Sequence, residues 1–243
     1  FLTQTFWGLG TDQKDTTHPI SADCIHTQSA QDIFDGISYG KGAAFLKQIL
    51  FQYGKKVMTD GLATYFETFS YKNTQLPDFI HHLSEAAKKA GHTNDLEAWT
   101  DTWLKTAGCC YIWHDIKEEN GKITKFTVNQ KVHENGDGNR LRVQKYQTAF
   151  FDENMKIIKV VDVLLKDDQE SFDMTELEGT DAPYAMFINY GNHGFGKFII
   201  DPKSINGLEE KLNLIEDSLV RKHVYSTIDD MLIKNEISGV RAL

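Results

Sequence analysis

The spacing of apolar residues changes twice along this chain, at Gly108 and at Pro202, and these changes limit the possible folds more than any other feature. Before Gly108 apolar residues recur every three or four positions, which predicts amphipathic helices. Between 109 and 201, short β-prone segments are separated by turn residues, which predicts strands. The helical spacing returns after Pro202. The pattern therefore predicts an α+β protein with three consecutive regions, 1–108, 109–201 and 202–243.

The first region is expected to be helical after an irregular opening. Pro77 suits the first turn of a helix, Asn94 or Asp95 can cap another, and Gly91 and Gly108 can end them. The four apolar stripes, which we interpret as core faces, are Ala43, Leu46, Leu50 and Tyr53; Met58, Leu62, Tyr65 and Phe69; Phe79, Leu83, Ala86 and Ala90; and Leu96, Trp99, Trp103 and Ala107.

The second region contains candidate strands at 109–116, 123–131, 141–151, 156–165, 171–175, 184–190 and 196–201. Asn120-Gly121 predicts a hairpin, because both residue types tolerate the positive φ of a type I′ turn. About seven short strands favour an antiparallel β-sandwich. In the third region, Leu208, Leu212, Ile215 and Leu219 predict one helix, and Tyr225, Ile228 and Leu232 predict a second.

Charge and cysteine content exclude several classes of protein. The 26 Lys and Arg residues against 35 Asp and Glu give a net charge of −9, and a nucleic-acid partner is not expected without a basic stripe. No apolar run approaches the roughly 18 residues of a membrane span. Cys24, Cys109 and Cys110 make neither a disulfide framework nor a zinc knuckle, and the chain has no glycosylation sequon and no signal peptide. We therefore expect a cytoplasmic protein with free thiols.

The segment 34–44, FDGISYGKGAA, places the phenol of Tyr39 directly before an apolar helix. Together with THPI at 17–20 and FSYKNT at 69–74, it resembles the zinc aminopeptidases of the aminopeptidase N and puromycin-sensitive type, the M1 family. The resemblance extends over nearly the whole chain and is sharpest at 17–53. It departs from the family at Gly108-Cys109-Cys110, where a proline is usual.

The resemblance implies the C-terminal, helical part of a thermolysin-like catalytic domain at 1–108. A β-sandwich would follow at 109–201, and the start of a solenoid-like helical domain at 202–243. It also implies that Tyr39 stabilises the tetrahedral intermediate of peptide hydrolysis. A phenol suits this role, because its pKa of about 10 keeps it a proton donor at neutral pH. Without the resemblance, the residues favour the interpretation of Tyr39 as a buried tyrosine that caps a helix.

His-Glu-x-x-His, which would supply zinc ligands and the general base, does not occur in these 243 residues. We therefore expect a fragment whose zinc ligands precede Phe1 in a longer parent, and which is inactive on its own. Its partners would be a peptide substrate and the remainder of the parent polypeptide. His82 and Glu85 share a helical face but lack a second histidine, so a metal site is not predicted there.

The neighbours of Tyr39 suggest supporting roles. Lys41 is interpreted as structural, Asp35 as a residue that caps or orients the turn, and His18 as a loop residue with no metal to bind. Gly40 and Gly42 are expected to allow close approach of another backbone. Two alternatives remain open: a non-catalytic aminopeptidase-like scaffold, and an enzyme of the leukotriene-hydrolase type, which usually lacks the sandwich.

Overall fold

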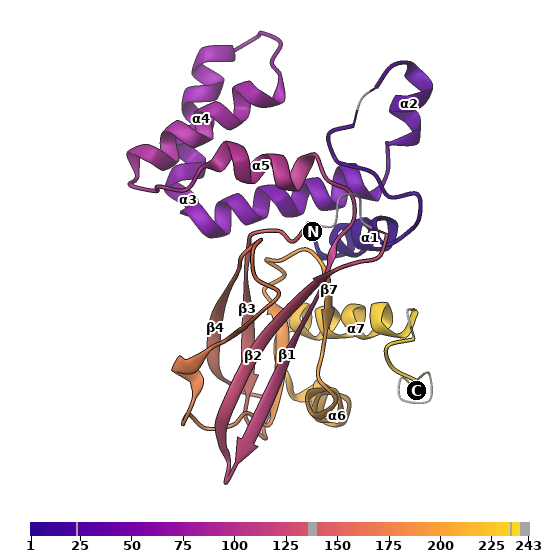
Figure 1. Cartoon of the computed structure of the whole chain (residues 1–243), viewed down its shortest axis with the longest axis vertical. Coiled ribbons are helices and arrows are strands. Elements are labelled where there is room, and N and C mark those ends of the chain that lie inside the picture. Colours follow the sequence, from indigo (N-terminus) through magenta and orange to yellow (C-terminus); the bar gives the residue numbers. More distant parts are fainter. Residues whose placement is uncertain (23, 136–139, 234, 239–243) are drawn as a thin grey trace.

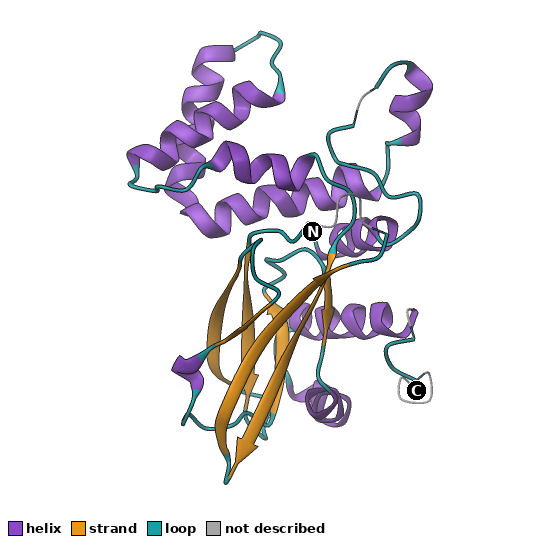
Figure 2. Cartoon of the chain, viewed as in Figure 1, coloured by secondary structure: helices purple, strands orange, loops and turns teal. Residues whose placement is uncertain are grey.

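A computed structural model of the chain describes residues 1–22, 24–135, 140–233 and 235–238. A group of helices lies at one end of the molecule and two facing β-sheets lie at the other, with two further helices beside the sheets (Figure 1). The chain is thus an α+β protein, as its apolar spacing predicts, and Figure 2 shows the change from helix to strand after α5.

The helical end contains five α-helices and one π-helical turn among the described residues. They are α1 Leu2–Asp12, α2 Thr27–Asp32, the π-turn Ile37–Lys41, α3 Gly42–Phe69, α4 Leu76–Lys89 and α5 Leu96–Leu104. Asp95 caps α5, because its side chain accepts hydrogen bonds from the backbone N–H groups of Glu97 and Ala98. The predicted break between the first two helices is a kink within α3, where Gly54 has a φ of +87°.

The buried face of α3 lies one residue away from the predicted stripe. Leu46 and Leu50 are each 41% exposed, whereas Phe45 and Ile49 are 3% and 0% exposed. Both pairs have helical spacing, so the period identifies the helix without identifying its inner face. The prediction for Leu46 and Leu50 was therefore wrong.

The irregular opening was also wrong, because residues 2–12 form α1. Its buried residues, Thr5, Gly8, Leu9 and Asp12, follow a helical spacing. Only Leu9 among them is a large apolar residue, and two glycines, Gly8 and Gly10, lower the helical propensity of the segment. Tertiary packing on the π-turn and α7 compensates for this weak local preference.

All seven predicted strands are present. They are β1 Cys110–Glu119, β2 Lys122–Val132, β3 Gln144–Phe151, β4 Ile157–Leu165, β5 Ser171–Asp173, β6 Ala185–Tyr190 and β7 Lys197–Ile199. The hairpin turn has the predicted geometry, with φ of 51° at Asn120 and 74° at Gly121. The sheets have the orders β5-β2-β1-β7 and β4-β3-β6, and their pairs are antiparallel apart from β1 with β7, which is parallel.

The region after Pro202 forms α6 Pro202–Lys211, a 3₁₀ turn Leu212–Leu214 and α7 Ser218–Ile233. The predicted helix through Leu219 is therefore interrupted, because the chain becomes extended at Ile215. α6 packs on β6 and α7 on β7, and both helices share one apolar core with the two sheets. Helices α1, α3, α4 and α5 enclose a second core, to which Phe195 also belongs. The three-domain division remains a prediction.

Side chains from the helical end bind the backbone of the sheet end. Gln48 on α3 donates to the carbonyl oxygens of Lys145, at 2.6 Å, and His193, at 2.5 Å, and accepts from the Lys145 N–H at 2.9 Å. The indole N–H groups of Trp99 and Trp103 both donate to the Val143 carbonyl. These contacts fix the helices against the loops at one end of the sandwich.

None of the described helices is both long enough and apolar enough to span a membrane. Cys24 is exposed, Cys109 and Cys110 are buried, and all three carry free thiols.

Two buried histidines, His114 on β1 and His223 on α7, have no charged partner that would favour protonation. Burial lowers the pKa of His114 from 6.5 to about 3, and the His114 Nε2 atom lies 2.8 Å from the Tyr146 hydroxyl. Burial, followed by the nearby charge of Lys47, lowers the pKa of His223 from 6.5 to about 3. The rings of Phe6 and Phe187 pack edge-on against His223.

These histidines should make the chain sensitive to acid. Between pH 6.5 and pH 3 the unfolded chain protonates His114 and His223 while the folded chain does not, so the free energy of unfolding should fall as pH falls through this window. Urea titrations at a series of pH values measure the effect. His223→Gln should weaken the pH dependence, whereas His81→Gln, at an exposed position, should leave it unchanged. Equal pH dependence in both variants would contradict the assignment.

Candidate active-site turn

Tyr39 lies in the π-helical turn Ile37–Lys41, which leads directly into α3. π-Helical turns are rare and are frequently found at functional sites. The Tyr39 side chain is 49% exposed, so the proposal of a buried helix-capping tyrosine does not fit the structure. Among the described residues no hydrogen bond engages its hydroxyl, which leaves the phenol able to donate to a ligand.

Two aromatic side chains hold the Tyr39 ring. Trp7, on α1, stacks on it with ring centroids 6.3 Å apart and an interplanar angle of 22°. Phe34 packs edge-on, with centroids 5.0 Å apart at 82°. Stacked and edge-to-face pairs each favour one ring orientation. The phenol is therefore held in a fixed direction although about half of it faces solvent.

Three glycines bring α1 into backbone contact with the turn. A Cβ atom on Gly8 would lie 2.7 Å from the Gly36 carbonyl oxygen, and one on Gly36 would lie 2.6 Å from the Trp7 carbonyl oxygen. A Cβ atom on Gly40 would overlap the Gln4 carbonyl oxygen. The expectation of close approach is thus confirmed for Gly40. It is wrong for Gly42, whose added Cβ would meet nothing within 4 Å.

Asp35 organises the start of the turn, as predicted. Its Oδ1 accepts hydrogen bonds from the N–H groups of Ile37, at 2.8 Å, and Ser38, at 3.2 Å. Its Oδ2 lies 3.1 Å from His18 Nε2, while His18 Nδ1 lies 2.8 Å from the Pro19 carbonyl oxygen. Both ring nitrogens of His18 thus face an oxygen acceptor. His18 therefore joins the loop before α2 to the Tyr39 turn.

Lys41, at the other end of the turn, is completely buried. Its Nζ forms an ion pair with Asp12 Oδ2 at 3.0 Å and donates to the carbonyl oxygens of Gly108, at 2.8 Å, and Thr106, at 3.3 Å. Burial, followed by the nearby positive charge of Arg142, lowers the pKa of Lys41 to about 8, although Asp12 opposes the shift. The interpretation of Lys41 as structural agrees with this position.

Sequence analysis missed the residues that support the turn from elsewhere in the chain. α1 was not predicted, so its residues Trp7, Gly8 and Asp12 were not recognised as support for the turn. The helical spacing of Thr5, Leu9 and Asp12 was the available signal. Arg142 also escaped notice, because a lone arginine within the predicted strand 141–151 carries no signal of its burial.

The described residues do not fit a metal site. Within them, no three His, Cys, Asp or Glu side chains lie close enough together to hold an ion. His82 and Glu85 have other neighbours: His82 Nδ1 lies 3.0 Å from the Thr64 hydroxyl, and Glu85 pairs with Lys88 at 3.0 Å. Any zinc site would need ligands beyond those described here.

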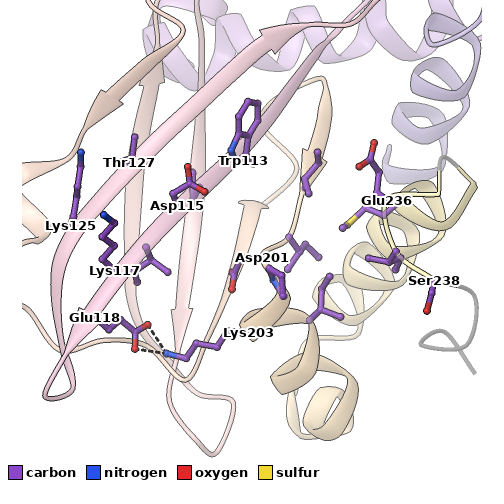
Figure 3. Close-up of a pocket in the computed structure, with 18 residues that line it drawn as sticks. Trp113, Asp115, Lys117, Glu118, Lys125, Thr127, Asp201, Lys203, Glu236 and Ser238 are labelled. Atoms are coloured by element: carbon purple, nitrogen blue, oxygen red, sulfur yellow. Dashed lines mark hydrogen bonds and ion pairs between the residues drawn. The ribbon is translucent and has the colours of Figure 1, made fainter.

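A groove of about 1100 Å³ lies between the outer face of β1 and β2, α6 and the segment that follows α7 (Figure 3). Several of its charged groups are already engaged by the fold. Glu118 pairs with Lys203 at 2.6 Å, and Asp201 caps α6 through the Ser204 N–H. Asp115 accepts from the Asn129 amide at 2.8 Å. The groove does not include Tyr39, and the Tyr39 turn remains the better candidate site.

Comparison with known proteins identifies relatives of this chain. Residues 1–103 match the peptidase family M1 domain. The chain is 28% identical to aminopeptidase N of Streptomyces lividans over 96% of its own length and 27% of the relative's length. It is 34% identical to a leucyl aminopeptidase of Saccharolobus solfataricus over 44% of this chain and 13% of that protein. It is 31% identical to aminopeptidase M1-A of Oryza sativa subsp. japonica over 51% of this chain and 13% of that protein. The chain therefore spans at most about a quarter of these relatives.

The glycines offer a test of how tightly the turn is held. Gly40→Ala should lower the free energy of unfolding by about 1–3 kcal/mol or more, because its methyl group would overlap backbone that cannot move independently. Gly42→Ala should be neutral or stabilise the chain by up to about 1 kcal/mol, because Gly42 is helical and its methyl group would have open space. Denaturant titrations of both variants measure the difference. Equal free energies of unfolding for the two variants would show that α1 is not in close backbone contact with the turn at Gly40.

Proposed function

The chain belongs to peptidase family M1, and we propose that it supplies the oxyanion-stabilising tyrosine of an aminopeptidase. Tyr39 is the residue assigned this role. The proposed reaction is hydrolysis of the first peptide bond of a peptide, with release of the N-terminal amino acid. The relatives are named as aminopeptidases, which supports a peptide substrate.

The carrying observation is the state of the Tyr39 side chain. It is half exposed, its hydroxyl has no partner among the described residues, and Trp7 and Phe34 fix its ring. Buried polar groups are normally hydrogen-bonded within the protein, whereas this half-exposed hydroxyl is available to a ligand. Attack on a peptide carbonyl places negative charge on the oxygen, and a preorganised donor stabilises that charge more in the transition state than in the ground state.

We further propose that the active protein is zinc-dependent, as peptidases of this family generally are. The described residues do not hold the metal, so its ligands would belong to other parts of the full-length protein. This chain's own contribution is the phenol and the rigid turn that carries it. On this proposal the chain alone is inactive. The three free thiols support a reducing, cytoplasmic location, which we propose as well.

Replacement of one hydroxyl tests the proposal. In the zinc-loaded full-length protein, Tyr39→Phe should lower kcat by about 10²–10³-fold, because one oxyanion donor contributes about 2.7–4 kcal/mol. The loss should appear in kcat with little change in KM, because the donor acts on charge that develops during the reaction. Hydrolysis of aminoacyl-coumarin substrates measures both constants.

Tyr71→Phe is the matched control, because Tyr71 is fully exposed and its hydroxyl should be dispensable. It should retain the activity of the unmodified protein. Equal activity of Tyr39→Phe and Tyr71→Phe would remove Tyr39 from the reaction. A full-length protein that binds zinc and cleaves none of a complete set of aminoacyl substrates would instead support the non-catalytic scaffold.

A further inference from the structure

Lys41 lies two residues after Tyr39 in the same π-turn, and its ammonium group reaches the junction between the helical end and the sheet end. The ammonium group forms an ion pair with the Asp12 carboxylate and donates hydrogen bonds to the Thr106 and Gly108 carbonyl oxygens. The side chains of Lys41 and Asp12 are both 0% exposed. The contact distances lie between 2.8 and 3.3 Å, and together these contacts hold one end of the turn.

The segment that Lys41 holds is bound from the other side by the sheet end. The Arg142 guanidinium donates to the carbonyl oxygens of Thr102 at 3.3 Å, Thr106 at 3.2 Å and Ala107 at 2.9 Å. Two cations therefore share the carbonyl groups at the end of α5 and in the link to β1, where positive charge is favourable. Phe195, from the β6–β7 loop, places its ring 5.9 Å from the Lys41 ammonium.

Helix α1 connects this junction to the phenol. Trp7 stacks on Tyr39, and Asp12, about one and a half turns further along the same helix, pairs with Lys41. A displacement of Lys41 therefore moves both the turn and the helix that orients the phenol. Displacements of about 1 Å at a catalytic group can cost about 10²-fold in rate.

We propose that Lys41 is a positioning residue, through which residues 102–108 and the sandwich loops set the direction of the Tyr39 phenol. This inference rests on the proposed aminopeptidase function and deepens it. A filler of space would not need a charge at this position, because burial of an ion pair is costly and apolar residues of similar size can replace it without loss of stability. The directional contacts of Lys41 are what an apolar residue could not reproduce.

A double-mutant cycle in the zinc-loaded full-length protein separates positioning from stability. The first arm replaces the pair by neutral residues, Lys41→Met with Asp12→Asn, so that no buried charge is left unpaired. The second arm is Tyr39→Phe, and the third combines both. The first arm should lower kcat by about 10–10²-fold with KM nearly constant. The combined variant should be no slower than Tyr39→Phe alone, since without the hydroxyl there is nothing left to position.

A second buried ion pair provides the matched control. Lys197 is 0% exposed, and its Nζ lies 2.8 Å from Asp230 Oδ2. Asp230 Oδ1 also accepts from the Gln13 amide at 3.0 Å, and an asparagine at 230 keeps that acceptor for α1. Lys197→Met with Asp230→Asn removes the same chemistry and should lower the melting temperature while leaving kcat of the folded protein unchanged. If the Lys41 arm does not fold, Arg142→Gln serves in its place, because it loosens residues 102–107 without touching the turn.

The outcomes are distinct. Inactivity of the unmodified zinc-loaded protein would reject the proposed function itself. In an active protein, a kcat loss from the Lys41 arm that persists in full on the Tyr39→Phe background would reject positioning and leave Lys41 a purely stabilising role. An unchanged kcat in the folded Lys41 arm would also reject the positioning role. The same holds for an unchanged kcat in Arg142→Gln, where that variant replaces the Lys41 arm. A kcat loss that appears when Tyr39 is present, and disappears when Tyr39 is replaced by Phe, would establish the positioning role of Lys41.

Discussion

The buried ion pair between Lys41 and Asp12 is the contact on which the arrangement of this chain depends. Removing two charges from water costs several kcal/mol and is tolerated only where the remaining hydrogen-bonding groups are satisfied. Asp12 Oδ1 accepts from the Thr17 hydroxyl at 2.7 Å and from the Gly108 N–H at 3.1 Å, while Lys41 donates to backbone carbonyls. One pair of charges thereby ties α1, the loop that follows it, the Tyr39 turn and the start of the sandwich.

A neighbouring residue extends this network to α7. Gln13, directly after Asp12, donates to Asp230 Oδ1 at 3.0 Å, and Asp230 pairs with the buried Lys197 of β7. The C-terminal end of α1 therefore adjoins both buried ion pairs, one serving the candidate site and one joining β7 to α7. The helical end, the sheets and the last helix meet at two consecutive residues. This arrangement explains why a short helix with a weak local preference is nevertheless well packed.

The sequence predicted those parts of the structure that depend on local periodicity. All seven strands and the Asn120-Gly121 turn were found, because alternation and positive-φ residues are properties of neighbours in the chain. α1 was missed, because its Gly8 serves a contact with Gly36 and Gly40, about 30 residues further along the chain. The inner face of α3 was misplaced, since Phe45 and Leu46 are both apolar and only the packing of α5 distinguishes them. Tyr39 was proposed through resemblance, whereas Arg142 and Trp7 act through tertiary contacts that no local pattern encodes.

The close fit of three glycines and one ion pair has a consequence for the order in which the molecule assembles. The Tyr39 turn touches residues near the beginning of the chain, residues 106–108 and Phe195, so its final geometry depends on pairs of positions separated by up to about 150 residues. Contacts of such long range form late, after local helices and hairpins. During synthesis, the phenol is therefore made before residues 106–108 and Phe195, which help to orient it. A partly folded molecule would carry the tyrosine without its orientation, so the proposed stabilisation of an oxyanion would require completion of the sandwich.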